Sequence, residues 1–327
     1  METLHHVLNK MFGVSVRRAE YKETELQGGT VGDVRLIEGT FETENGDKLP
    51  YKFVLKTQGK WERPGDPDSW RREYDLYLSD LGEVFRPKCY HAEMSGDKFQ
   101  IWLEYVEGVS GNALTTEMLE QAAYEIGRFQ GEIFSKPELV KDLSNFGDTG
   151  YLKRDYEQWH SPGKSFEYSY LRSARCTLPQ HLKQMIFDID DNMDTLFDRI
   201  SKLPVVLCHR DFWLENIIFS DGKIRLIDWD TSGWGYLGED LASLIADEID
   251  FNNFEEYCQR LIPAYYRGIS EYMDISGIKD RFIREMILIK FGYRMVQAFM
   301  FAENASESEE AVQALQKVFS FLSKISN

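Results

Sequence analysis

The pattern of hydrophobic and polar positions divides the chain into two parts. Residues 14–57 contain three alternating runs separated by turns with glycine, which is typical of antiparallel strands. Residues 68–81 then carry aromatic side chains three or four positions apart, which predicts a helix. Two further runs, 88–94 and 98–106, predict a second hairpin. The first part is therefore expected to be rich in β-structure.

Helical periodicity dominates the chain after Gly108, and strand patterns return only within residues 205–230. The predicted helices lie near residues 116–134, 178–202, 239–248, 254–272, 278–302 and 307–325. We therefore predict an α+β fold with two lobes: a small antiparallel β-rich lobe (residues 1–104) and a larger, mostly helical lobe (residues 105–327).

Composition and charge limit the kinds of partner. The formal net charge of −17 disfavours nucleic acid, because phosphate backbones attract basic surfaces, and it favours a cationic small molecule. No apolar run approaches the roughly 20 residues that cross a bilayer, and the first residues lack a signal-peptide pattern. The four cysteines are scattered without a CxxC pair, as in reduced cytosolic proteins. We expect a cytoplasmic protein that binds neither nucleic acid nor membrane.

The stretch VVLCHRDFWLENIIFSDGKIRLIDWD (residues 205–230) carries most of the candidate chemistry. Asp221-Gly222 between two apolar runs is a strong hairpin signal. Such a hairpin brings Asn216 and Asp228 to its open end. An amide oxygen beside a carboxylate suits Mg²⁺, which takes few protein ligands and completes its shell with phosphates and water.

Asp211 precedes that hairpin and is expected to enter the same end. A carboxylate beside a metal–phosphate site can accept the proton of a substrate hydroxyl. The spacing HRD-x-x-x-x-N followed by a later aspartate matches the template of phosphoryl transfer. Each of these residues alone is more often an ordinary loop residue, and their joint spacing favours function.

A glycine-containing turn upstream is a candidate phosphate-binding loop. QGGTVGDV places Gly28, Gly29, Thr30 and Gly32 between two predicted strands, where backbone N–H groups can approach phosphates. The signal is weak alone, since hairpin glycines are more often simple turns.

The third predicted strand ends in FVLK, which puts Val54 and Lys56 on one face. Lys56 can then point at phosphate while Val54 covers an adenine ring, although Lys52 shares the same parity. Glu73, on the predicted helix, lies at the edge of the apolar stripe and needs a partner. Lys56 is one candidate partner, and a neighbouring arginine or solvent is the other.

The segment LEYVEG sits at the predicted junction of the two lobes, and ligand sites favour such clefts. The backbone of Glu104 and Val106 is therefore a candidate for hydrogen bonds to an adenine edge.

With these residues assembled, the chain resembles the aminoglycoside phosphotransferase and choline kinase families, small-molecule kinases with a protein-kinase-like fold. The motifs that carry the resemblance are VVLCHRDFWLENIIF, IRLIDWDTSGWGYLGEDLA, FVLK and QGGTVGDV. The resemblance implies that Asp211 is the catalytic base and that Asn216 and Asp228 bind Mg²⁺. It also implies that Lys56 holds the α- and β-phosphates of ATP, and the motifs do not distinguish ATP from GTP.

The resemblance assigns supporting roles as well. His209 would brace the catalytic loop, and Asp240, in GEDLA, would support that loop from a helix start. These families usually have glycine where this chain has Arg210, whose role the sequence leaves open. HRD is the protein-kinase form, but the short interval from Asp228 to the next helix leaves no room for a long activation loop.

The substrate implied is a small molecule with a hydroxyl group and a positive charge, either aminoglycoside-like or choline-like. Asp230 is a candidate for contact with the cation, and Trp213 could supply an aromatic face, although core packing is the simpler reading of the tryptophan. Residues 151–170, rich in aromatics, either line the substrate site or pack the lobe. The competing hypothesis is a kinase-like protein that binds a nucleotide or metabolite without turnover, but Lys56, Asp211 and the metal ligands are all present.

Overall fold

The fold was analysed in a computed structural model of the 327-residue chain. The structure describes all residues except 1, 27–31, 64–65, 80, 82–84, 142, 144–145, 158–160, 248–252, 279–280, 305–308 and 326–327. Two compact units are present. The first comprises Met1–Val109, Glu138–Phe146 and Ile218–Thr231, and the second comprises Ser110–Pro137, Gly147–Ile217 and Ser232–Asn327.

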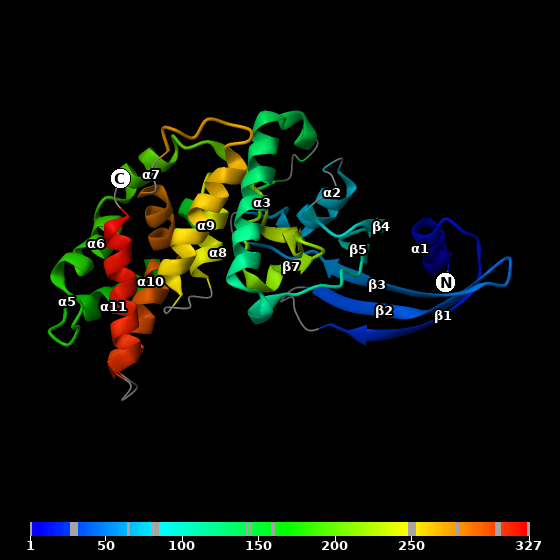
Figure 1. The fold of residues 1–327 in the computed structure, drawn as a ribbon, viewed down its shortest axis with the longest axis horizontal. Helices are drawn as coiled ribbons and strands as arrows, with labels where there is room; N and C mark the ends of the chain where they lie inside the picture. Colours follow the sequence, from blue (N-terminus) through cyan, green and yellow to red (C-terminus); the bar gives the residue numbers. More distant parts are fainter. Residues whose placement is uncertain are drawn as a thin grey trace. The chain divides into compact units, whose positions relative to one another are not determined.

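The first unit is built on a five-stranded antiparallel sheet, drawn in blue and cyan in Figure 1. Its strands are β1 (Val16–Glu25), β2 (Gly32–Thr43), β3 (Lys48–Gly59), β4 (Cys89–Ser95) and β5 (Lys98–Glu104), in the order β1-β2-β3-β5-β4. Helix α1 (Glu2–Phe12) packs its apolar face on this sheet, with Leu4, Val7 and Leu8 in one core with Phe41 and Phe53. The strand patterns predict the sheet, but they do not predict α1.

The predicted helix at 68–81 is shorter than its pattern. A 3₁₀ turn (Ser69–Arg71) leads into α2 (Arg72–Leu78), and its buried Trp70 and Tyr77 form a second core with Phe99. The predicted hairpin is confirmed. Strands β7 (Ile217–Ser220) and β8 (Lys223–Leu226) pair, and the turn between them has the two positive φ angles of a type I′ turn.

This hairpin belongs to the first unit although it lies far along the chain. Val109 and Phe219 form an antiparallel bridge with backbone hydrogen bonds in both directions, of 2.9 and 2.8 Å. Gly108 lies so close that an added Cβ would come within 2.5 Å of the Phe219 carbonyl oxygen. The structural units therefore differ from a division of the chain at residue 104.

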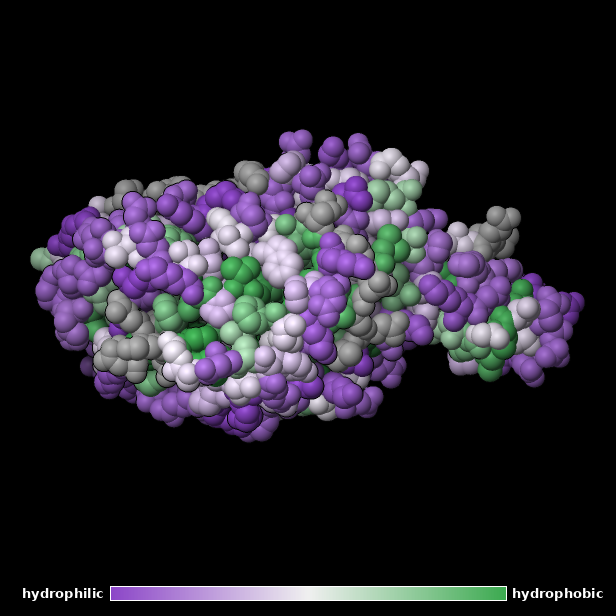
Figure 2. Space-filling view, turned by 90° about the horizontal axis from the view of Figure 1, so that it is seen from above, coloured by the Kyte–Doolittle hydropathy of each residue, from purple (hydrophilic) through white to green (hydrophobic). Residues whose placement is uncertain are grey.

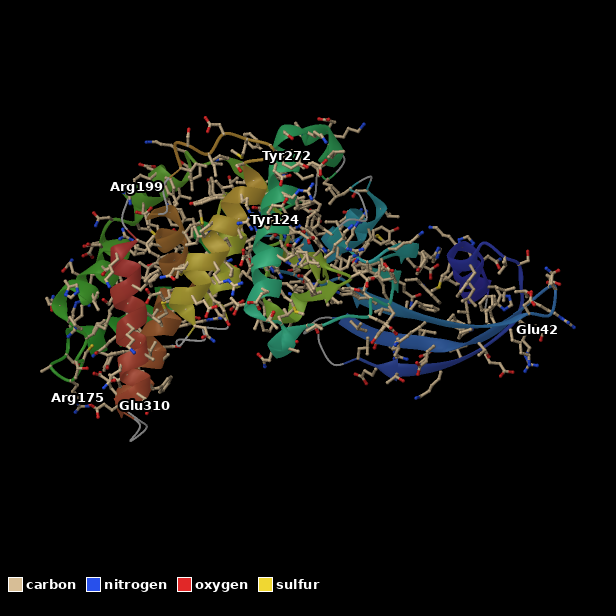
Figure 3. All side chains as sticks on the ribbon, in the orientation of Figure 1. Glu42, Tyr124, Arg175, Arg199, Tyr272 and Glu310 are labelled. Atoms are coloured by element: carbon tan, nitrogen blue, oxygen red, sulfur yellow. The ribbon has the colours of Figure 1, made fainter. Side chains whose placement is uncertain are left out.

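The second unit is mostly helical. Its longer helices are α3 (Thr116–Ser135), α5 (Ser161–Arg172), α6 (Gln180–Asp191), α7 (Met193–Ile200), α8 (Glu239–Ala246), α9 (Phe254–Ile269), α10 (Arg281–Asn304) and α11 (Glu309–Lys324), with a short α4 (Tyr151–Asp155). Helices α3 and α9 touch at glycines, and Tyr124, labelled in Figure 3, lies on α3. Tyr124 and Arg128 of α3 each donate a hydrogen bond to the carboxylate of Glu271, just beyond α9. The region predicted as one helix at 178–202 is two helices that meet at Asn192.

The expectation that strands return only within 205–230 is wrong. Strand β6 (Val205–Cys208) pairs with β9 (Gly233–Tyr236), a Gly-Trp-Gly-Tyr segment without a strand pattern. With this addition the α+β prediction is confirmed.

Hydrophilic side chains cover most of the face seen in Figure 2. Among the described residues, no helix is both long and apolar enough to span a membrane.

Candidate active site

Lys56 is the centre of a buried ion-pair cluster in the first unit. Its Nζ lies 2.5 Å from Glu73 Oε2 and 2.7 Å from Asp228 Oδ1. Burial alone would lower the pKa of Lys56, but the charges of Glu73 and Asp228 outweigh burial and raise it above the usual range. Burial also raises the pKa of Glu73, against the opposing charge of Lys56. Lys56 therefore stays positively charged, as an interaction with a phosphate group would require.

The structure resolves two alternatives that the sequence leaves open. Lys52 lies over the Tyr105 ring and 3.4 Å from exposed Glu107, so it is not the lysine of the cluster. The arginines beside Glu73 have other partners, since Arg71 binds Asp75 and Arg72 binds Asp66. Glu73 is thus paired with Lys56, one of the two alternatives that the sequence leaves open.

The Asp228-Trp229-Asp230 segment is fastened to α2. Arg72 donates to the Asp230 carbonyl oxygen at 3.1 Å and to both carboxylate oxygens of Asp66 at 2.7 Å. Trp229 is fully buried and donates to the Leu226 carbonyl. The Asp230 carboxylate lies 3.6 Å from Arg63, and burial, with the charge of Asp228, raises the pKa of Asp230 to about 7. Its proposed role in contacting a substrate cation stays a prediction.

Of the predicted phosphate-binding loop, Gly28, Gly29 and Thr30 lie outside the described residues. Gly32 begins β2 and pairs with Gln58 of β3, the strand that also carries Lys56. An added Cβ at Gly32 would lie 3.2 Å from the Thr57 carbonyl oxygen and 3.7 Å from Lys56 Cε. The glycine here lets β2 lie close to the backbone of β3 at Thr57.

Of the residues predicted to contact adenine, Val54 lies on β3, whereas Glu104 ends β5 and Val106 follows it. Val54 pairs with Leu103 and shares a face of β3 with Lys56. Glu104 already uses its backbone N–H for the Lys88 carbonyl oxygen, at 2.8 Å, and half-buried Val106 follows β5. These nucleotide contacts stay predictions.

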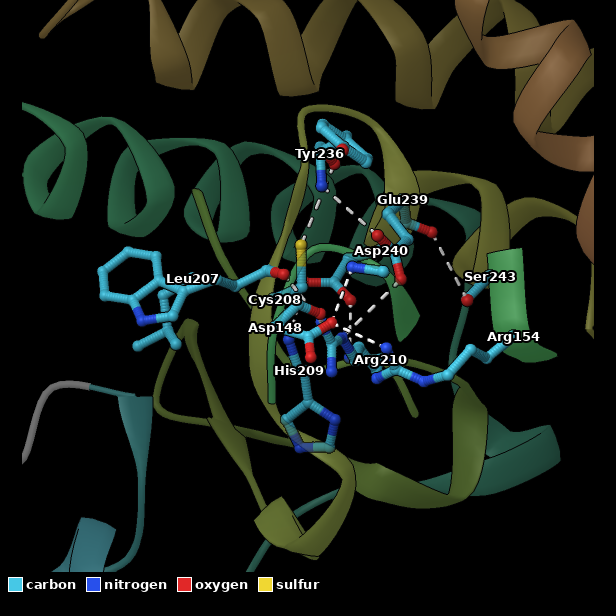
Figure 4. Close-up of polar contacts among 12 residues, drawn as sticks. Asp148, Arg154, Leu207, Cys208, His209, Arg210, Tyr236, Glu239, Asp240 and Ser243 are labelled. Atoms are coloured by element: carbon cyan, nitrogen blue, oxygen red, sulfur yellow. Dashed lines mark hydrogen bonds and ion pairs between the residues drawn. The ribbon is translucent and has the colours of Figure 1, made fainter. Parts of the chain in front are cut away.

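The loop of the second unit that carries Asp211, the candidate catalytic loop, is anchored by Asp240, at the start of α8 (Figure 4). Its carboxylate accepts the backbone N–H of His209 at 2.8 Å and that of Arg210 at 2.7 Å. Gln130 of α3 donates to the same carboxylate at 2.8 Å and accepts from Tyr265 of α9. Burial raises the pKa of Asp240, and the His209 charge and the backbone N–H groups oppose that rise. The loop is therefore held by a buried network that joins three helices.

Arg210 stands in the left-handed region, with φ of 69°, which explains why a glycine suits this position. Its side chain is fully buried, and Nη2 donates to the carbonyl oxygens of Asp148 and Trp234, each at 2.7 Å (Figure 4). The guanidinium also lies over the Tyr151 ring, 4.3 Å from its centre. At Gly233 of β9 an added Cβ would come within 2.5 Å of the guanidinium. Arg210 thus connects the candidate catalytic loop to β9 and to the start of α4.

Asn216 fixes the candidate base. Its Nδ2 donates to Asp211 Oδ2 at 2.7 Å and to the Asp211 carbonyl oxygen at 2.9 Å. The amide nitrogen is thereby occupied, and the amide oxygen is the atom suited to a metal. Half-buried Trp213 lies between Asp211 and Asn216 in the sequence and directly precedes the 3₁₀ turn Leu214–Asn216. Its predicted contact with a substrate stays a prediction.

The two predicted metal ligands belong to different units, and each offers an oxygen atom. Asp228 offers a carboxylate with a third of its side chain exposed, and Asn216 offers an amide oxygen, both hard ligands. Among the described residues no group of three or more His, Cys, Asp or Glu side chains could hold a metal.

Several supporting residues have no signal in the sequence. Gln130, Arg72 and Arg63 act through partners that are distant along the chain, and only the folded structure brings them together. Asp247 follows α8 and forms an ion pair with Arg294 of α10 at 3.0 Å. Burial raises the pKa of Asp247, Lys290 and Arg294 oppose the rise, and the charge of Asp211 adds to it. Asp247 therefore lies within electrostatic reach of the candidate base.

Comparisons with known proteins identify the family of this chain. Residues 53–274, more than half of the chain, match the model of the phosphotransferase enzyme family. Ethanolamine kinase 1 of Mus musculus is 25% identical over 113 residues, which are 29% of this chain and 31% of the mouse protein. The Homo sapiens enzyme is 27% identical over 95 residues, 26% of this chain and 21% of the human one. The chain thus spans less than a third of the length of these relatives.

Solved structures show the same fold. A choline kinase from Cryptosporidium parvum Iowa II has a TM-score of 0.54 at 16% identity, over 94% of this chain and 88% of that one. Amicoumacin kinase hAmiN, solved with AMP-PNP, Ca²⁺ and Ami, has a TM-score of 0.52 at 15% identity, over 98% and 92%. With the family model matched over most of its length, this chain belongs to the phosphotransferase enzyme family.

Proposed function

We propose that the protein transfers the γ-phosphate of ATP, with Mg²⁺, to a hydroxyl group of a small cationic molecule. The observation that carries this proposal is the fixed carboxylate of Asp211. Asn216 orients it, and Asp240 holds the two residues before it by their backbone N–H groups. A carboxylate held in this way is suited to accept a hydroxyl proton.

Each set of residues has its part in the transfer. Lys56, kept charged by Glu73 and Asp228, binds the α- and β-phosphates. Asp228 and Asn216 would hold Mg²⁺, which neutralises charge on the phosphates when bound. The acceptor oxygen attacks the γ-phosphorus, the bond to the β-phosphate oxygen breaks to release ADP, and Asp211 takes the hydroxyl proton.

Two observations support a cationic acceptor. The chain has a formal net charge of −17, and its curated relatives are named as ethanolamine kinases. A negative protein raises the local concentration of cations and speeds their association.

A phosphotransfer screen tests this function. The full chain would be incubated with Mg·ATP or Mg·GTP and with amino alcohols, quaternary ammonium alcohols, aminoglycosides and neutral sugars, and both ADP and the phosphorylated alcohol would be measured. We expect product with at least one cationic alcohol and its loss on chelation with EDTA. Nucleotide binding without product from any alcohol would favour the competing hypothesis of a binding protein without turnover.

A further inference from the structure

Strand β1 is an edge of the five-stranded sheet and presents a long row of exposed residues (Figure 1). It spans ten residues, and all of them except Val16 and Ala19 are exposed. The other edge strand, β4, is shorter and contacts both α1 and α2. Backbone N–H and C=O groups on the outer side of an edge strand can pair with a strand of another chain. β1 is therefore the edge of this sheet that is open to a partner.

The charges of β1 are ordered so that the strand complements itself. Arginines stand near its start, glutamates stand near its end, and Glu20 and Lys22 lie on either side of Tyr21. Two antiparallel copies related by a two-fold axis at Tyr21 place Glu20 opposite Lys22 and Arg17 opposite Glu25, and each pair occurs twice. Opposite charges that face each other across two strands stabilise the pairing.

The neighbouring symmetric registers bring like charges together. Side chains that face each other across two strands lie on the same face of the sheet, so the two-fold axis must pass through a residue and not between two residues. An axis at Glu20 places this glutamate opposite its own copy and Arg18 opposite Lys22, and an axis at Lys22 places two lysines opposite each other. Axes further from the centre of β1 shorten the paired segment. The charges thus favour the register centred on Tyr21.

The backbone at the centre of β1 is oriented for this register. Tyr51 of β3 donates to the Glu20 carbonyl oxygen at 3.2 Å. Gly39 of β2 pairs with Tyr21 and lies so close to β1 that an added Cβ would clash with the same carbonyl oxygen. The Glu20 carbonyl therefore points into the sheet. Because backbone groups of successive residues point to opposite sides of a strand, those of Tyr21 point to the open edge and can bond to their own copy.

A groove on the sheet reaches β1 at the same point. Its volume is about 700 Å³, and it is lined by Glu20, Tyr21 and Lys22 of β1, by Met11 and Phe12 at the end of α1, and by residues of β2 and β3. Tyr21 is 53% exposed although it is a large aromatic residue. In the register centred on Tyr21, the two tyrosines face each other beside this groove, and aromatic pairs across strands stabilise such a contact.

We propose that two copies of the chain associate through β1, antiparallel about a two-fold axis at Tyr21, and join their sheets into one continuous sheet. The partner is a second copy because the order of charges along β1 matches its own reverse. The opposing explanation is that these charges protect the edge and keep the chain monomeric. The two explanations predict opposite effects of charge reversal.

Reversal of single charges tests the pairing in solution. Sedimentation velocity of the full chain over about 1–100 µM would measure the dissociation constant of the dimer. Glu20→Lys puts two lysines opposite each other on both sides of the axis, and Lys22→Glu does the same with glutamates, so each should weaken the dimer about tenfold or more. Both side chains are exposed, so folding should not change. A wild-type chain that is monomeric throughout, or a dimer that neither reversal weakens, would overturn the inference.

Combining the two reversals provides the matched control. An equimolar mixture of the Glu20→Lys chain and the Lys22→Glu chain restores opposite charges across the axis, so it should form heterodimers with about the wild-type affinity. A chain with both substitutions should regain self-association for the same reason. Glu20 also forms an ion pair with Arg18 of its own strand at 2.7 Å, and that contact is lost in every chain with Glu20→Lys. Recovery therefore reports the contact across the axis, and no recovery in either experiment would contradict the proposed register.

A cysteine at the axis tests the register directly. Residues that face each other in antiparallel strands have Cα atoms about 4.5–5.5 Å apart, within the range of a disulfide. Tyr21→Cys should therefore form a covalent dimer on mild oxidation. Lys22→Cys is the control, because its own copy would lie about 8 Å away. The wild-type chain, whose four cysteines are buried or half-buried, gives the background. Equal cross-linking of the two variants would overturn the register centred on Tyr21.

Discussion

Two buried charge clusters, one in each unit, satisfy their charges in different ways. Lys56 forms ion pairs with two carboxylates, Glu73 and Asp228, and a third of the Asp228 side chain is exposed to solvent. Around Asp240 nothing is accessible, and the carboxylate accepts backbone N–H groups and an amide.

The difference separates groups that exchange partners from groups that do not. Lys56 and Asp228 neutralise each other in the structure, and under the proposed function we expect a phosphate to compete for Lys56 and a cation to compete for Asp228. The backbone donors of Asp240 cannot leave, and Arg210 likewise donates to two carbonyl oxygens. Charged residues satisfied by backbone are thus positioning residues, and substitutions should separate the two classes.

The largest effect is expected from Asp211→Asn. It removes the proton acceptor and retains the shape, so phosphate transfer should fall by about a thousandfold or more, while Mg·ATP binds with little change. Steady-state kinetics and nucleotide titration measure the two quantities. As a control, Asp221→Asn changes a turn aspartate in a position with positive φ that asparagine also tolerates, and it should leave transfer intact. Undiminished transfer by Asp211→Asn would remove the aspartate from the mechanism.

Asp240→Asn should act on stability and on turnover together. An amide cannot accept all three donors, and a buried N–H left without an acceptor costs about 1–3 kcal/mol. We expect the free energy of unfolding in urea to fall by that amount and kcat to fall as the loop loosens, with KM for ATP nearly unchanged. A fall in affinity for ATP alone would contradict the assignment of Asp240 to the loop.

The sequence predicts the local features of this site well. The Asp-Gly turn and the parity of Val54 and Lys56 follow from short-range patterns, and the structure contains both, whereas the partner of Glu73 was left open between Lys56 and other groups. These features depend on neighbours within a strand, a turn or a helix edge.

Features that depend on distant partners were not predictable. Strand β9 has two glycines in four residues, and its glycines are needed because Arg210 and Glu239 pack against them. Helix α1 is short, and its apolar face becomes buried only when it packs against the sheet. The role of Arg210 is visible only when Asp148 and Trp234 are brought beside it.

Arg210→Gly sharpens the comparison, because it introduces the residue usual in related families. The glycine relieves a positive φ worth about 1 kcal/mol, and the lost hydrogen bonds cost about 1–3 kcal/mol. We expect a net loss of up to about 2 kcal/mol and a several-fold lower kcat with KM for ATP unchanged. Arg210→Lys keeps the positive charge but lacks the planar guanidinium group, so it should recover little of the lost stability or of kcat. Full recovery of both would show that charge alone matters.

The smallest effect is expected at the hairpin turn that leads to Asp228. Gly222 has φ of 74° and nothing within 4 Å of an added Cβ, so Gly222→Ala introduces backbone strain without a clash. The free energy of unfolding should fall by about 1 kcal/mol, and kcat should not change because the turn only connects strands. Gly277→Ala is the matched control, since its added Cβ also meets nothing and its φ is ordinary. Equal stability of the two variants would show that the positive φ is not needed, and a loss of kcat in Gly222→Ala would place the turn with the positioning residues.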